Sequence, residues 1–154
     1  MILGKWGQLG LFGRSASNDI DTLNYMVEVA GHIKSNSSSY RVIESNETVR
    51  LYQYSDNVLR VPVINDASGE SVDASSFSRA EYIIASAKGD VRVRLSLDEG
   101  VVIKEDAFII FIDDSKLDKS FKGNFNHQFV VWNESGDKLP PLFMSRIMIE
   151  RVIL

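Results

Sequence analysis

From residue 40 onward, apolar and polar residues alternate with a period of two. The clearest case is the run 91–97, in which Val91, Val93, Leu95 and Leu97 alternate with polar side chains. This alternation is typical of a strand with one buried and one solvent-exposed face. Further strands are predicted over residues 48–54, 58–64, 79–86, 101–103, 107–113, 125–133 and 142–153.

Turn-forming residues separate these runs. The segments 65–69, 88–90, 98–100 and 133–137 each combine Asn or Asp with a Gly, which can take a positive φ. About seven short strands with a turn signal every 8 to 12 residues are typical of a β-sandwich. No alternation of strand and helix supports a parallel sheet. The pattern therefore predicts a mainly β protein, an antiparallel β-sandwich over residues 40–154.

Upstream, the period changes to that of a helix. Ile20, Leu23, Val27 and Ala30 are spaced so that they line one helical face, and acidic residues stand where the helix would begin. We expect an α-helix at about 18–34, ended by the Ser/Asn-rich segment 36–39. The chain is thus divided into an N-terminal segment, 1–39, and the sandwich, 40–154.

The first fifteen residues carry a repeat of three. Glycine stands at positions 4, 7, 10 and 13, and a large apolar residue precedes each one: Leu3, Trp6, Leu9 and Phe12. A backbone with three residues per turn would place the apolar side chains along one edge. Two interpretations follow. Either Gly turns fold these residues onto the sandwich, or an extended arm docks its apolar edge into a neighbouring subunit.

The run 108–112, Phe-Ile-Ile-Phe-Ile, is apolar on both faces. One face can fill the interior of the sandwich, and the other must be covered as well. The N-terminal helix is one candidate for this cover, and a second subunit is the other.

Composition and charge narrow the function classes. The chain has 154 residues, a formal net charge of -4 and no cysteine, so disulfides, thiolate metal sites and a cysteine nucleophile are excluded. Basic residues form no tract of the kind that binds nucleic acid. No apolar run is long enough to cross a membrane, and the first residues lack the features of a secretion signal. We expect a soluble protein made in a cytosol, with neither a nucleic-acid nor a membrane partner.

Candidate chemistry is sparse. His127 falls in an apolar row and is predicted to be a hydrogen-bonded core residue, while His32 falls near the expected helix C-terminus. The acidic pairs at 98–99, 105–106 and 113–114 flank strands where turns are due and match no calcium loop. No nucleophile elbow or phosphate-binding loop occurs. We therefore expect no enzyme activity, no metal and no cofactor.

Aromatic residues leave one alternative open. Tyr52 and Tyr54 share one face of their strand, and Trp132 points away from the row that contains Phe129. Such residues could form a stacking platform for a sugar on a β-sandwich. The alternative function is thus a carbohydrate-binding or host-adhesion module.

Two segments carry a resemblance to a known family. Residues 66–73 read D-x-x-G-x-x-V-D, and Gly123, Phe125 and His127 open a long strand that closes with a Gly turn at 133–136. Over about residues 48–154 the chain resembles the immunoglobulin-like domain of bacteriophage baseplate and tail-fibre attachment proteins. The resemblance implies an immunoglobulin-like fold and a structural role in a virion.

The predicted function is therefore assembly. The sandwich would be a building block of a phage tail, baseplate or collar, located in the virion. Its partners would be other tail or baseplate proteins and copies of itself, in a homo-oligomer. The N-terminal arm and helix would make the contacts, with the anchors Leu3, Trp6, Leu9, Phe12, Ile20, Leu23 and Val27.

Overall fold

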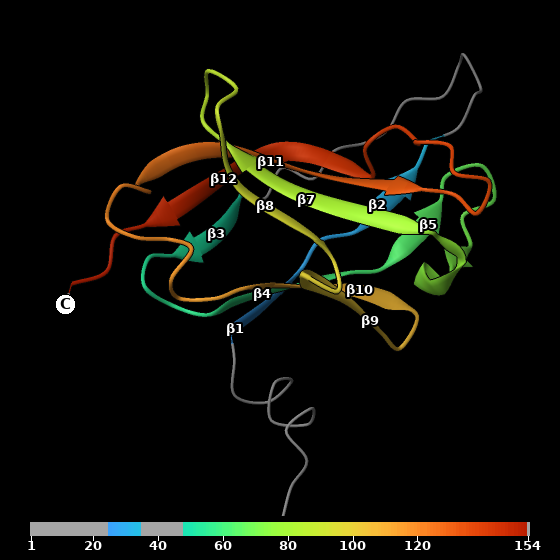
Figure 1. The fold of residues 1–154 in the computed structure, drawn as a ribbon, viewed down its shortest axis with the longest axis horizontal. Helices are drawn as coiled ribbons and strands as arrows, with labels where there is room; N and C mark the ends of the chain where they lie inside the picture. The colour runs from blue at the N-terminus through green and yellow to red at the C-terminus, as the bar shows by residue number, and fades with distance from the viewer. Residues whose placement is uncertain (1–24, 35–47, 154) are drawn as a thin grey trace, which may run out of the picture.

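The computed structural model describes residues 25–34 and 48–153 and shows a mainly β protein (Figure 1). Its strands are β1 (Tyr25–Glu28), β2 (Gly31–Ile33), β3 (Val49–Tyr52), β4 (Asn57–Val61), β5 (Val63–Asn65), β6 (Ser71–Val72), β7 (Arg79–Ala85), β8 (Val91–Leu97), β9 (Gly100–Lys104), β10 (Ala107–Ile112), β11 (Gly123–Trp132) and β12 (Phe143–Glu150). A 3-10 helix, η1 (Ala74–Ser76), precedes β7. Within these two ranges there is no α-helix.

Nine of the strands form one sheet that folds over into two layers. The order across this sheet is β1-β4-β10-β9-β8-β7-β11-β12-β3, and β2-β5-β6 form a second, small sheet. In Figure 1, β7, β11 and β12 lie in the upper layer, and β1, β4, β9 and β10 lie in the lower one. β8 runs from the upper layer to the lower one, so the two layers belong to one nearly closed sheet.

The expectation of an antiparallel arrangement is wrong, because the sheet is mixed. β1 pairs with β4, β12 with β3 and β8 with β9 in the parallel sense. The first two pairs join strands that are far apart in the sequence, so no hairpin fixes their direction. The third pair comprises only Ser96 with Gly100 and Leu97 with Val101. Side-chain alternation reports which face of a strand is buried and carries no information about the direction of its partner.

The α-helix expected over 18–34 is wrong for residues 25–34. β1 and β2 occupy this stretch, and β1 satisfies its backbone by pairing with β4, for example Val27 with Leu59. Val27 and Val29 are partly buried against the core. β-Branched residues suit a strand packed on a core better than an isolated helix. Residues 18–24, the arm 1–15 and the linker 36–39 lie outside the described residues, and the division of the chain at residue 39 stays a prediction.

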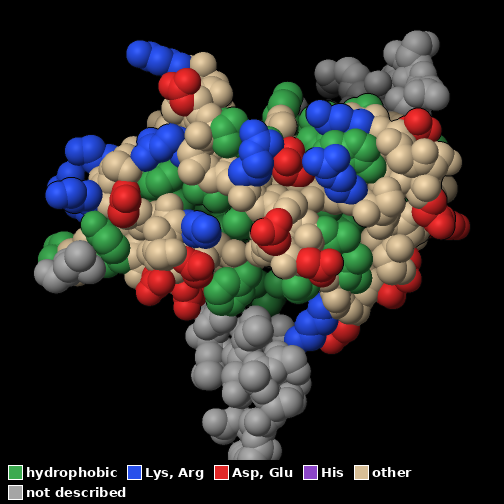
Figure 2. All heavy atoms as spheres, viewed as in Figure 1, with side chains coloured by type: hydrophobic (Ala, Val, Ile, Leu, Met, Phe, Trp, Pro, Cys, Tyr) green, Lys and Arg blue, Asp and Glu red, His purple; other side chains and the backbone are tan. Residues whose placement is uncertain are grey.

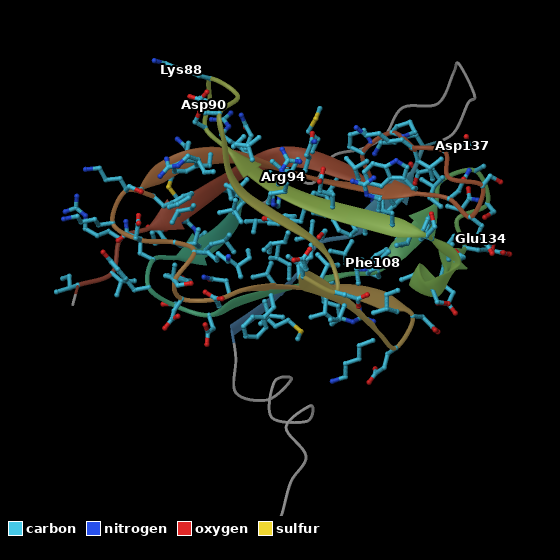
Figure 3. The ribbon with its side chains drawn as sticks, in the orientation of Figure 1. Lys88, Asp90, Arg94, Phe108, Glu134 and Asp137 are labelled. Carbon is cyan, nitrogen blue, oxygen red and sulfur yellow. The ribbon has the colours of Figure 1, made fainter. Side chains whose placement is uncertain are left out.

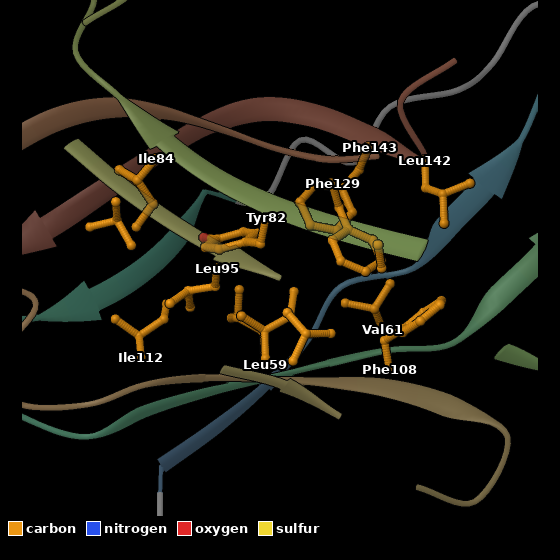
Figure 4. Packing of buried hydrophobic residues seen from close by; sticks show 14 of the residues in the cluster. Leu59, Val61, Tyr82, Ile84, Leu95, Phe108, Ile112, Phe129, Leu142 and Phe143 are labelled. Atoms are coloured by element: carbon orange, nitrogen blue, oxygen red, sulfur yellow. The ribbon is translucent and has the colours of Figure 1, made fainter. Parts of the chain in front are cut away.

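The core lies between the two layers (Figure 4). Phe129 and Phe143 come from the upper layer, Leu59 and Phe108 come from the lower one, and all four are buried. The ring centroids of Phe108 and Phe129 are 5.0 Å apart with the rings edge to face, and those of Phe129 and Phe143 are 5.9 Å apart. Aromatic contacts of this geometry add to the free energy gained by burial alone.

Gly100 shapes the turn at which β8 passes into β9. Its φ is +100°, and a Cβ atom there would lie 2.8 Å from Cδ2 and 3.1 Å from Cβ of the buried Leu95. We expect Gly100→Ala to lower the free energy of unfolding by about 2–3 kcal/mol, through backbone strain and overpacking together. Urea unfolding measures this loss.

Gly136 provides the matched control for this prediction. Its φ is +87°, and a Cβ atom there would have nothing within 4 Å. Gly136→Ala should therefore cost about 1 kcal/mol through backbone strain alone. Equal losses in the two variants would contradict the contact with Leu95.

Candidate functional site

Of the residues predicted to form an interface, the structure describes only Val27. Leu3, Trp6, Leu9, Phe12, Ile20 and Leu23 lie outside the described residues. Val27 stands in β1 and is partly buried against the core of its own chain. It therefore contributes to the fold, and any contact that it makes with a partner stays a prediction.

The lower layer has an apolar face that points away from the core. Met26, Val58 and Phe111 are neighbours across β1, β4 and β10, and Ile109 is paired with Val102 of β9. Side chains two positions apart lie on the same face of a strand. Met26, Val58, Val102, Ile109 and Phe111 are therefore called the outer apolar face.

The exposure of the outer apolar face differs from one strand to the next. Val102 is 48% exposed and Met26 and Phe111 are half-buried, whereas Val58 and Ile109 are buried. Among the charged side chains on this face, Glu28 and Arg60 form an ion pair at 2.5 Å, and Lys104 stands two positions from Val102 on β9. In Figure 2, hydrophobic side chains show at the middle of the lower margin, on the side where β1 and β9 lie in Figure 1, with charged side chains on either side of them. Contiguous exposed apolar patches of about a few hundred Å² mark interaction sites, and of these five residues only Val102 is exposed.

β10 confirms the prediction that the run 108–112 is apolar on two sides. Phe108, Ile110 and Ile112 belong to the core, while Ile109 and Phe111 lie on the outer apolar face. Sequence reasoning found this strand and missed its companions Met26, Val58 and Val102. Their signal was present in consecutive apolar pairs such as Val58-Leu59 and Val101-Val102, of which only one member can face the core.

The outer face of the upper layer is more polar. Arg94 of β8, Ile83 of β7, Gln128 of β11 and Met144 of β12 form one row across it. Arg94 pairs with Glu81 at 3.0 Å, and Met144 is 64% exposed. Figure 3 shows Arg94 on this layer, with Lys88 and Asp90 at the tip of the hairpin that stands away from the body. The two layers thus present chemically different surfaces.

A hydrogen-bonded chain of three side chains runs from the core to the surface. Nδ1 of His127 lies 2.9 Å from the hydroxyl of the buried Tyr82, and Nε2 lies 3.0 Å from Oγ of the exposed Ser145. This arrangement confirms that His127 is a hydrogen-bonded core residue. Burial lowers the pKa of His127 to about 3 and raises that of Tyr82. The imidazole is therefore neutral at pH 7 and is a weak base, poorly suited to activating Ser145.

The aromatic residues considered for sugar binding are not brought together. Trp132 ends the ten-residue strand β11, and Gly123 begins it. Gly123 pairs with Ile149, which pairs with Leu51, the neighbour of Tyr52. Tyr52 and Trp132 are therefore separated by about 30 Å along the strands.

Two basic side chains approach the ring of Trp132. Cζ of Arg79 is 4.4 Å from the centroid of its ring, and Nζ of Lys138 is 5.6 Å from it. These contacts have the geometry of cation–π interactions. A sugar that stacked on this ring would compete with these basic side chains for it.

The charged residues considered for metal binding do not form a common site. The carboxylate of Asp113 accepts hydrogen bonds from the backbone and hydroxyl of Ser115, which lower its pKa. His32 stands in β2, where Nδ1 lies 2.7 Å from Oδ1 of Asp66, so its expected place at a helix C-terminus is wrong. Across residues 25–34 and 48–153, no three His, Asp or Glu side chains converge on a possible metal position.

In the same ranges, no helix is long and apolar enough to cross a membrane.

Comparison with known proteins gives a likeness of fold and no family. No family model matches the sequence, and no curated protein matches it either. Among solved structures, the chain is similar to the N-terminal domain of phage TP901-1 ORF48, with a TM-score of 0.51 and 12% identity, over 82% of this chain and 98% of that one. It also matches the Clostridium thermocellum CbhA fibronectin(III)-like modules, with a TM-score of 0.37 and 10% identity, over 71% of this chain and 95% of those modules.

Proposed function

We propose that this chain is a structural component of a bacteriophage virion and that it acts in the tail, baseplate or collar. The observation that carries the proposal is the match to the N-terminal domain of phage TP901-1 ORF48, which covers nearly the whole of that domain. A fold can serve many functions, so the likeness supports the proposal without fixing the position in the particle.

The proposed activity is assembly by protein–protein contact, without catalysis. The outer apolar face offers surface suited to burial, whereas His127 is a weak base and the aromatic candidates are dispersed. The partners would be other virion proteins and further copies of this chain in a homo-oligomer. The N-terminal segment, with its apolar anchors at Leu3, Trp6, Leu9 and Phe12, would fasten the β domain to its neighbour.

Removal of residues 1–15 tests this assignment. The truncated chain should remain folded and soluble but should lose incorporation into the particle, because the four large apolar anchors go with the deleted segment. Circular dichroism and gel filtration would follow folding. Complementation of a phage that lacks the gene, with the chain detected in purified particles, would follow incorporation.

Two further variants distinguish the effect of losing the apolar side chains of residues 1–15 from the effect of shortening the chain. Replacing Leu3, Trp6, Leu9 and Phe12 together by serine keeps the length and should also abolish incorporation. Met144→Ser alters a 64% exposed side chain on the other layer and should leave incorporation unchanged. Normal incorporation of the truncated chain would contradict the role of the arm. Loss of folding would instead place the arm in the core.

A glycan array distinguishes the alternative function. A host-adhesion module should still bind a specific glycan after residues 1–15 are removed, since Tyr52, Tyr54 and Trp132 remain in the chain. The separation of Tyr52 from Trp132 and the basic side chains over the Trp132 ring favour assembly over this alternative.

A further inference from the structure

We infer that residues 25–33 are exchanged between copies of this chain and fill the groove along β4 and β5 of a neighbouring copy, an inference that rests on the proposed assembly function. The proposed function gives the N-terminal segment the task of fastening the β domain to a neighbour. The pairing of residues 25–33 adds which surface of the neighbour is used and makes that neighbour a second copy.

Residues 25–33 form one run along the edge of the fold. From Tyr25 with Asn57 to Ile33 with Asn65, each paired residue faces the residue 32 positions later, so β1 and β2 follow β4 and β5 in one parallel register. β1 is the outermost strand of the nine-stranded sheet, and β2 is the outermost strand of the small sheet. In Figure 1 these two blue strands lie one after the other beside β4 and β5. Their departure would interrupt no other strand pair in either sheet.

The groove that this run fills is lined by the core. Val61 of β4 is fully buried, and Val27 and Val29 of the run pack against the core cluster to which Val61 belongs. Gly31 makes the closest approach, since a Cβ atom there would lie 3.0 Å from Cγ1 of Val61 and 3.1 Å from Cβ of Leu142. Exposure of such apolar residues to water is unfavourable. Residues 25–33 of one copy or another therefore have to fill the groove.

Polar contacts hold the run to parts of the chain that are distant in sequence. The N–H of Val29 donates to the carbonyl of Arg60 at 2.9 Å. The side-chain contacts of Glu28 with Arg60 and of His32 with Asp66 cross 32 and 34 positions. A neighbouring copy offers the same acceptors and charges in the same places. Exchange would therefore preserve each of these contacts, which is why swapping of an identical element costs little free energy.

The connection from the run to the rest of the chain is long enough for exchange. A hairpin ties a strand to its partner by a few residues, whereas parallel partners need a longer connection. Residues 35–47 supply thirteen positions, which span up to about 45 Å when extended. In a homo-oligomer, the groove of an adjoining copy is present at a high effective concentration. The covalent connection thus allows the run to enter either groove.

Cysteine cross-linking tests the exchange on the full chain, which contains no natural cysteine. Glu28→Cys would be introduced into one copy and Arg60→Cys into another copy that carries a size tag. These two residues are opposite one another in β1 and β4, at a separation that a disulfide can span. The copies would be unfolded in urea, mixed, refolded together and mildly oxidised, and hybrid disulfides would be read on a denaturing gel.

The expected hybrid yield is at least about ten times that of a matched control, because a disulfide requires the two thiols to be held together. The control replaces Arg60→Cys by Met144→Cys, whose side chain is 64% exposed on the other layer. A hybrid yield no higher than that of the control would show that the run stays on its own chain and would overturn the inference.

A double variant with Glu28→Cys and Arg60→Cys in one chain locks the run onto its own copy. It would be refolded at low concentration, oxidised, isolated as a monomer and added to a lysate of cells infected by a phage that lacks the gene. The locked chain should not enter particles, and a reducing agent should restore its incorporation. Normal incorporation of the locked chain would contradict the exchange while leaving the proposed function in place. Absence of the unaltered chain from particles would instead overturn the proposed function.

Discussion

Phe129→Ala is expected to lower the free energy of unfolding by about 3–5 kcal/mol. Phe129 is fully buried at the centre of β11, where it faces Tyr82 of β7 on one side and Phe143 of β12 on the other. Its ring also contacts Phe108 of the opposite layer. Truncation would leave a cavity that both layers line, and neither layer can close it without breaking strand pairing.

Thermal and urea unfolding would measure this loss, and Met144→Ala is the matched control. Met144 is the neighbour of Phe143 on β12 but points outward and is 64% exposed, so its truncation should change the free energy of unfolding by less than about 0.5 kcal/mol. A loss below about 1.5 kcal/mol in Phe129→Ala would show that the two layers do not meet around this ring.

Stability should fall as the pH is lowered from 7 to 5, and His127 should be the cause. Burial lowers the pKa of His127 in the folded protein to about 3, from 6.5 in an unperturbed side chain. Between these values the unfolded chain binds a proton that the folded chain does not, so acid favours unfolding. The stability is fully present above pH 6.5 and is lost progressively toward pH 3. The expected loss between pH 7 and pH 5 is about 2 kcal/mol.

Three carboxylates with lowered pKa values affect the stability of the fold at a lower pH. Hydrogen bonds from Ser75, Ser115 and Ser120 lower the pKa values of Asp73, Asp113 and Asp118 below 3.8. These carboxylates lose their stabilising effect only as the pH falls below that value. These three carboxylates therefore do not cause the decline between pH 7 and pH 5.

Two substitutions isolate this effect in urea unfolding measured at several pH values. His127→Gln keeps a hydrogen-bonding side chain near Tyr82 but cannot titrate, so the decline between pH 7 and pH 5 should disappear. Ser145→Ala removes the hydroxyl beside Nε2 but keeps the buried imidazole, so the decline should persist. An unchanged decline in His127→Gln would contradict the assignment.

The sequence alone determined the strands that carry a regular alternation, and their turns. The runs 79–86 and 91–97 correspond closely to β7 and β8, because buried residues such as Tyr82, Ile84, Val93 and Leu95 alternate with less buried ones along most of each strand. Gly69, Gly89, Gly100 and Gly136, all placed in predicted turns, have positive φ values. These features are local: the period of a strand and the backbone freedom of glycine do not depend on what lies next to them.

Only the tertiary structure decided which strands are partners and in which direction they run. The apolar spacing of residues 20–30 suits a helix in isolation, yet β1 pairs with β4 because this pairing satisfies its backbone and buries Val27 against the core. Gln53 donates to the carbonyl of Phe121 and accepts from the N–H of Val152, contacts across 68 and 99 residues. The outer apolar face likewise exists only because β9 and β10 bring Val102 beside Ile109. Periodicity fixes which side of a strand is apolar. The neighbour that meets that side depends on long-range pairing, whose free energy is shared among strands far apart in the sequence.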